Sequence, residues 1–251
     1  MKARLTGLRR GTVAAALAVA VALGGCASVS GPANDSEAQR RADVDPLEGM
    51  NRAIFDFNQS LDDVLLRPVA RGYVAVVPEL FRWMISNAFA NLADLRIALN
   101  QLLQGKPLLA GSDLLRFGVN TVFCLGGIAD LASELGLERH NEDFGQTMGR
   151  WGIGSGPYLV LPLFGPSTVR DGLGLVVDIE TSPLIAINRR TTSTGLLALW
   201  IVDTRANLLD ASQLLEGAAL DKYLFLRDGY LQRRRNLIWD GDPPEEGEAP
   251  R

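Results

Sequence analysis

The chain has 251 residues, of which 47% are hydrophobic and 22% are charged, and this balance excludes a disordered polymer, a collagen-like repeat and a polytopic membrane protein. Its 25 Lys and Arg residues face 29 Asp and Glu residues, so no basic field exists to attract a nucleic acid partner. Two cysteines and one histidine are too few for a disulfide framework or a zinc site. We therefore expect no metal and no cofactor.

The first 25 residues have the pattern of a lipoprotein signal peptide. Basic residues from Lys2 to Arg10 precede the uncharged stretch Gly11–Leu23, which as a helix would be only about 20 Å long, too short to span a bilayer. The following sequence Leu-Gly-Gly-Cys resembles a lipobox, which predicts Cys26 as the lipidated N-terminus of the mature protein. Ordinary cleavage after Ala20 or Ala22 is the alternative, but it would cut inside or at the edge of the apolar stretch. No Asp follows Cys26, and by resemblance to lipoprotein sorting in Gram-negative bacteria this favours the outer membrane.

Composition divides the rest of the chain into three parts. Residues 26–44 are small, polar and charged, and we predict a flexible tether. Residues 240–251 contain prolines, glycines and acids, and we predict a disordered acidic tail. Residues 45–239 remain as a single domain of ordinary size.

Helical patterns fill the first half of that domain. Asp45, Pro46 and Glu48 predict a helix that begins at Pro46 and has Asp45 as its N-cap, with Asn51, Arg52 and Asn58 pointing away from its apolar face. Pro68 and Pro78 should bound a short segment. Apolar residues then recur at helical spacing from Phe81 to Leu102, and Ser112-Asp113 predicts the start of another helix, with Arg116 and Asn120 on a narrow polar side. The apolar residues of the first helix are Met50, Ile54, Phe57 and Leu61.

Further helical patterns follow at residues 173–177, 195–215 and 220–238, while alternation typical of strands is nearly absent, so the fold should be mainly α. Several segments, including 119–129 and 196–202, are apolar nearly all round but too short to cross a bilayer. They could form a buried central helix and its contacts. The alternative is a domain in or against lipid, with apolar surface outside and polar groups inside.

Glycine and proline mark the middle of the domain. Five glycines at positions 145, 149, 152, 154 and 156 predict a long hinged loop, and we take the region from about Leu135 to Gly156 as a gate. Three prolines among bulky apolar residues from Pro157 to Pro166 predict an extended hydrophobic segment.

Enzyme motifs are not convincing. Asp143-Phe144-Gly145 lacks the other motifs of a kinase, and His140, the sole imidazole, lies in a polar stretch where a solvated histidine is expected. Arg227 and the three arginines from Arg233 to Arg235 could contact phosphate. Their simpler role is to complement the dipole at the end of the last helix.

At this point the motifs resemble the MlaA (VacJ) family of outer-membrane lipoproteins, in the expected order and over nearly the whole domain. The chain has Met50 where that family would have an aromatic residue and Gly229 where it would have alanine or another small residue. The motifs are Asp45–Arg52, Leu66–Ala70, Asn100–Lys106, Asp143–Gly149, Gly156–Asp171 and Arg227–Arg234.

The resemblance implies a ring-like, mostly helical domain in the inner leaflet of the outer membrane, without enzymatic activity. Its central channel would remove phospholipids from the outer leaflet and pass them to a periplasmic carrier protein. The implied partners are phospholipids, a trimeric outer-membrane porin and that carrier. The residues predicted for the motif, the channel or its gate are Asp45, Pro46, Asn51, Phe57, Asn58, Phe144, Gly145, Gly149, Gly152, Gly156, Pro157, Gly165, Arg170 and Asp171.

Two other function classes stay open on sequence. A lipid-modifying enzyme of the phospholipase type would need a nucleophile and a base, for which His140 is the only imidazole. A passive structural lipoprotein would carry no lipid.

Overall fold

A computed structural model describes residues 44–186, 190–218 and 221–244. The chain divides into two compact units, Met1–Val44 and Asp45–Arg251, and the architecture below is that of the second unit. Cys26, the signal peptide and nearly all of the predicted tether therefore lie outside the described residues, as does the tail beyond residue 244. Among the described residues, no helix has the length and apolar character needed to cross a membrane.

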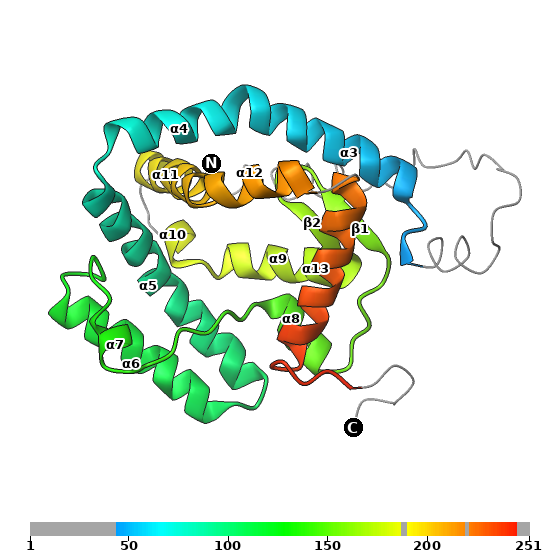
Figure 1. The fold of residues 1–251 in the computed structure, drawn as a ribbon. Coiled ribbons are helices and arrows are strands. Elements are labelled where there is room, and N and C mark those ends of the chain that lie inside the picture. The colour runs from blue at the N-terminus through cyan, green and yellow to red at the C-terminus, as the bar shows by residue number, and fades with distance from the viewer. Residues whose placement is uncertain (1–43, 187–189, 219–220, 245–251) are drawn as a thin grey trace, which may run out of the picture. The chain divides into compact units, whose positions relative to one another are not determined.

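The second unit is mainly helical, as predicted. One long helical run opens it (Figure 1): α3 (Glu48–Leu61) continues through the π-helical turn η1 (Asp62–Leu66) into α4 (Arg67–Val76). Pro68 and Pro78 were predicted to bound a short segment, and α4 is that segment, with Pro68 in its first turn and Pro78 just before the next helix. The π-helical turn directly before Pro68 joins α4 to α3.

Two long helices follow as a pair. The first is α5 (Glu79–Leu103), and it ends where expected, with Gly105 at a φ of 78°. The second is α6 (Pro107–Phe123), which begins at Pro107 rather than at Ser112, because a proline at the first helical position already has helical φ. A short helix, α7 (Leu131–Glu134), packs against α6.

The glycine-rich region is not one loop. Asp143 caps the helix α8 (Phe144–Arg150) by accepting a hydrogen bond from the backbone N–H of Gln146, so Gly145 and Gly149 are helical. The extended segment that follows forms an antiparallel hairpin of β1 (Tyr158–Leu161) and β2 (Gly165–Thr168), with Leu161 opposite Gly165. The sequence predicted extended backbone there but not the pairing.

Five helices complete the described part of the unit, and the helical patterns predicted for this half are confirmed. They are α9 (Val169–Glu180), α10 (Pro183–Ala186), α11 (Arg190–Asn207), α12 (Leu209–Ala218) and α13 (Lys222–Ile238). Thr168 and Asp221 cap α9 and α13 through their side-chain oxygens.

Contacts between these elements close into a circuit. The helical run α3–η1–α4 contacts α11, which contacts α5, and α5 contacts α8. The circuit continues from α8 to α13, from α13 to β2, across the hairpin, and from β1 back to α3. This arrangement agrees with the predicted ring-like helical fold.

The hydrophobic core is small and lies at the hairpin. It is formed by Tyr158, Val160 and Tyr223, against which Phe55 and Tyr230 pack with their rings in edge-to-face contacts. Elsewhere in the described residues, buried polar and charged residues outnumber buried hydrophobic ones. A soluble domain usually shows the reverse distribution.

Candidate functional site

Helices α5 and α6 bury their polar faces. On α5, Asn87, Asn91, Asp94 and Gln101 recur at helical spacing and are at most 8% exposed, whereas Leu95, Leu99 and Leu102 are 42%, 45% and 51% exposed. The same inversion occurs on α6, where Arg116 and Asn120 are buried, and Leu114 and Leu115 are exposed. The interpretation with apolar groups outside and polar groups inside is therefore correct for this part of the chain, and the buried-central-helix alternative is not.

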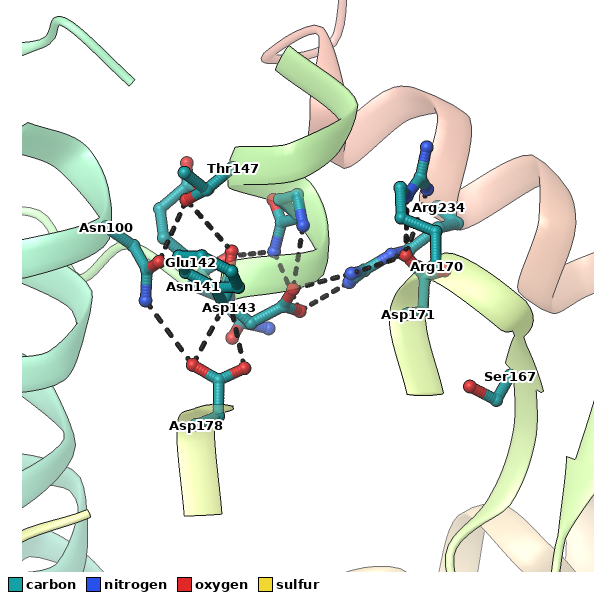
Figure 2. Close-up of polar contacts among 12 residues, drawn as sticks. Asn100, Asn141, Glu142, Asp143, Thr147, Ser167, Arg170, Asp171, Asp178 and Arg234 are labelled. Atoms are coloured by element: carbon teal, nitrogen blue, oxygen red, sulfur yellow. Dashed lines mark hydrogen bonds and ion pairs between the residues drawn. The ribbon is translucent and has the colours of Figure 1, made fainter. Parts of the chain in front are cut away.

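One polar cluster joins α5, α8, α9 and α13, and we call it the polar junction (Figure 2). Asp178 accepts hydrogen bonds from the Phe144 backbone N–H at 3.2 and 3.1 Å and lies 3.2 Å from Arg96. The Thr147 hydroxyl donates to Asn100 at 2.8 Å. Burial outweighs the Arg96 guanidinium and raises the pKa of the Asp178 carboxyl.

Arg234 of α13 forms the other side of the junction. Its guanidinium forms an ion pair with Asp143 and lies 3.0 Å from Asp171, so it joins the start of α8 to the start of α9. Burial alone would raise the pKa of both carboxyls, but Arg234 holds the pKa of Asp143 and of Asp171 below the ordinary value. Tyr230 also donates a hydrogen bond to Asp171, at 2.7 Å.

Gly145 and Gly149 permit this close approach. A Cβ on Gly145 would lie 2.4 Å from Nη2 of Arg234, and one on Gly149 would lie 2.9 Å from Ile238. These two glycines are packing positions in α8, so the prediction that they belong to a hinged loop was wrong. Gly152, with a φ of 85°, and Gly156, with a φ of 66°, do lie in the non-helical segment before β1 and need the freedom of glycine.

A second polar cluster connects α3, the hairpin and α13. Asn51 is fully buried, donates to Asp45 at 2.8 Å and to the Tyr158 carbonyl at 3.0 Å, and accepts from the Val160 N–H. Tyr223 also donates to Asp45. Asp45 therefore binds partners in this cluster and is not the N-cap of the helix, contrary to the prediction. Helix α3 begins at Glu48 and not at Pro46, which lies in the preceding turn. Its N-cap residue is Leu47, which makes no side-chain hydrogen bond.

Asn58 binds the other end of the hairpin. Its amide donates to the Leu161 carbonyl at 2.9 Å and accepts from the Leu163 N–H at 2.8 Å. Asn51 and Asn58, predicted to point away from the apolar face of this helix, bind β1 and the hairpin turn. Phe57, which belongs to the apolar face, is 54% exposed.

The remaining predicted residues lie around these two clusters. Pro157 accepts a hydrogen bond from the Val169 N–H, and Gly165 begins β2 with a φ of 81°. Arg170 is buried and binds both Asp171, at 3.0 Å, and the Ile153 carbonyl, at 3.1 Å. The structure therefore brings Arg170 and Asp171 to the polar junction together with Phe144, Gly145 and Gly149.

A third cluster, between α5, α6 and α7, was not foreseen. Arg116 lies 3.0 Å from Asp130 and 3.6 Å from Asp94, and burial raises the pKa of Asp94 to about 6. His140 lies 2.8 Å from the fully buried Asp113, so the expectation of a solvated histidine was wrong. The recurrence of Asn and Asp along one face of α5 was the signal that could have located this interior.

The C-terminal arginines divide between two roles. Arg227 is buried beside Asp45 and Asp228, at 3.6 and 2.9 Å, and Arg234 belongs to the polar junction. Both are therefore occupied by carboxylates and are not available to phosphate. Among the described residues, no group of three or more His, Cys, Asp or Glu side chains is arranged to hold a metal.

Comparison with known proteins identifies the family. Residues 43–237 match the family model of the MlaA lipoprotein. The chain is 35% identical to the intermembrane phospholipid transport system lipoprotein MlaA of Escherichia coli, over 98% of this chain and 93% of that protein, and 33% identical to the one of Haemophilus influenzae, over 95% and 94%. A solved structure described as the structural basis for maintenance of bacterial outer membrane lipid asymmetry superposes with a TM-score of 0.68, at 37% identity over 77% of this chain and 98% of that one. The chain therefore belongs to the MlaA lipoprotein family.

Proposed function

We propose that this chain is an outer-membrane lipoprotein that forms a channel for phospholipids, removes those that have strayed into the outer leaflet and so maintains lipid asymmetry. The names of its relatives support phospholipid transport, and the solved structure supports a role in outer-membrane asymmetry. Lipidation at Cys26 would hold the domain at the periplasmic face. A trimeric porin and a periplasmic carrier are the partners that the family resemblance suggests.

The inverted distribution of polar and apolar residues is the observation that supports this function most directly. The charged head of a phospholipid cannot cross an apolar barrier unless polar groups replace water along its route. The buried faces of α5, α6 and α9 offer such groups, while exposed leucines on the same helices suit contact with acyl chains. We propose that the polar interior lines the route and that the segment with Gly152 and Gly156 gates it.

The test is complementation of a strain that lacks its own family member. Outer-leaflet phospholipid is measured by chemical labelling of surface amine lipids. The wild-type chain should restore a low level, and Leu99→Glu should not, because a charge placed in the hydrocarbon region costs about 3 kcal/mol. Gln213→Glu, which adds the same charge at an exposed position of α12, is the matched control and should complement. Equal complementation by both variants would contradict lipid contact at α5.

We propose that the chain acts without catalysis. The His140–Asp113 pair favours the enzyme alternative, since a carboxylate can orient an imidazole base. However, no Ser, Thr or Cys lines the pocket that His140 faces in the described structure. His140→Ala should therefore complement the deletion strain fully at equal protein level. A complete loss of lipid asymmetry in this variant, with normal folding, would favour the enzyme alternative.

A further inference from the structure

A pocket of about 550 Å³ lies outside the polar junction, between the segment that precedes α8 and one face of α13. Its volume is within the range of small-molecule sites. The lining residues are His140, Asn141, Glu142, Gly229, Gln232, Arg233, Asn236, Leu237, Asp240 and Gly241.

The α13 wall contains a glycine that packing does not require. Gly229 lies inside the helix, where glycine is less stable than alanine by roughly 0.5–1 kcal/mol. A Cβ on this residue would meet no atom within 4 Å, so no close neighbour demands its absence. Gly229 shares one helix face with Gln232, Arg233 and Asn236, and its missing side chain leaves this wall of the pocket open.

The charges at the pocket are balanced but not all paired. Lys106 lies 2.6 Å from Asp240 and 3.5 Å from Glu142, so its ammonium forms ion pairs with both carboxylates. In the described part of the chain, the exposed guanidinium of Arg233 forms no hydrogen bond or ion pair. The Asp240 side chain remains 44% exposed and can accept further hydrogen bonds. The pocket therefore presents an unpaired cation and a reachable carboxylate, with amide groups of Asn141, Gln232 and Asn236 beside them.

We propose that this pocket binds a zwitterionic phosphodiester headgroup of the phosphoethanolamine class, with its phosphate on Arg233 and its ammonium on Asp240. The planar guanidinium fork matches phosphate oxygens, and the carboxylate matches an ammonium. A headgroup without the ammonium would place its negative charge near Asp240 without compensation and should bind less tightly. The inference rests on the proposed function, which supplies phospholipid to this domain. The same headgroup could come from a phospholipid or from a soluble glycerophosphodiester.

The sole histidine of the chain provides a probe in the pocket itself. The full-length lipoprotein, purified in detergent without a histidine tag and labelled with ¹⁵N, is titrated with glycerophosphoethanolamine, glycerophosphoglycerol or inorganic phosphate while the His140 ring signals are followed by NMR. The first ligand should give a saturable shift, and the other two should bind about tenfold more weakly. Tighter binding of short-chain phosphatidylethanolamine than of its deacylated form identifies the lipid as the source, and equal binding identifies the soluble diester.

Three variants test the assignment. Arg233→Gln and Gly229→Val should each weaken binding of glycerophosphoethanolamine by about tenfold or more, through loss of the phosphate partner and through filling of the pocket. Arg71→Gln removes the same charge from an exposed position on α4, which does not line the pocket, and should bind like wild type. Circular dichroism confirms that each variant is folded.

Wild-type affinity in Arg233→Gln, or no saturable response of His140 in the wild type, overturns the proposal. Lipid asymmetry is measured for the same proteins in the deletion strain. If the wild type restores asymmetry while its His140 does not respond, the pocket assignment fails and the proposed function stands. If the wild type does not restore asymmetry, the proposed function itself fails.

Discussion

Replacement of Arg234 by methionine should destabilise the domain strongly at neutral pH. The substitution keeps an unbranched, flexible side chain and removes the cation that pairs with Asp143 and Asp171. Removal of one partner from a buried ion pair costs about 3–5 kcal/mol, because the other charge stays buried without compensation. Asp171 is only 4% exposed, but Asp143 is 27% exposed and keeps its hydrogen bonds from Gln146. We therefore expect a loss near the lower end, about 3 kcal/mol.

The loss of stability in Arg234→Met should depend on pH, and the pKa shifts of the two carboxyls give the direction of this dependence. In the wild type, the folded state lowers the pKa of Asp143 and of Asp171. The ion pairs therefore stabilise the fold fully at pH values above the unfolded-state pKa of about 4. They lose this effect as the pH falls through the folded-state pKa values. Without Arg234, Asp171 still pairs with Arg170 and accepts a hydrogen bond from Tyr230, but fewer groups oppose burial, which raises its pKa, so its folded-state pKa is higher than in the wild type. The folded variant then takes up a proton at a higher pH than the folded wild type, and its deficit is smaller at pH 5 than at pH 7.5.

The assay is thermal unfolding in mild detergent, followed by circular dichroism at pH 7.5 and pH 5. A loss of about 3 kcal/mol corresponds to a fall in the unfolding midpoint of about 6–12 °C for a domain of this size. Arg233→Met, one residue earlier on α13 and exposed, is the matched control and should change stability by less than about 0.5 kcal/mol. The reasoning is refuted if the two variants lose the same stability, or if the deficit of Arg234→Met is as large at pH 5 as at pH 7.5.

Three further substitutions test other parts of the structure. Gly145→Ala should lower the unfolding midpoint by several degrees because its Cβ would meet Arg234 at 2.4 Å, whereas Gly154→Ala, with nothing within 4 Å, should not. Asn58→Ala should lower the free energy of unfolding by about 1–2 kcal/mol in thermal unfolding, because it releases both ends of the hairpin turn. Deletion of Asn58 rotates the following residues by about 100° and should raise outer-leaflet phospholipid much more than Asn58→Ala does. Cys26→Ala should remove the protein from the outer-membrane fraction in an immunoblot of separated membranes and abolish complementation; normal residence and complementation would contradict the lipobox assignment.

The sequence predicted where most helices lie but not which face they bury. The recurrence of leucines from Leu92 to Leu102 predicts an amphipathic helix whatever medium surrounds it, since periodicity records only that two faces differ. The opposite face carries Asn91, Asp94 and Gln101, which a soluble protein would expose. The environment of the helix, and not its pattern, decides that this polar face is buried.

The candidate site was also predictable only in part, because sequence patterns are local and the site joins distant segments of the chain. Asp171 and Arg170 lie in a motif and reach the polar junction, but Asn100 and Arg234 are brought there by two other helices, α5 and α13. No local pattern indicates a contact between residues 63 positions apart in the chain, such as Asp171 and Arg234. Glycine was also ambiguous. The same residue serves flexible backbone at Gly152 and close packing at Gly145, and only the neighbours of each position distinguish the two uses.

A polar interior also changes what stabilises the fold. Several buried polar atoms along α5 lack a hydrogen-bond partner within the described structure, including both amide atoms of Gln101 and both carboxylate oxygens of Asp94. Such atoms cost free energy in a dry interior and cost little where water or a polar headgroup can reach them. The leucines of α5 that are 42–51% exposed are only about half covered within the chain, and under the proposed function lipid would cover the rest. The same distribution that would weaken a soluble domain therefore suits one that holds polar groups inside and acyl chains outside.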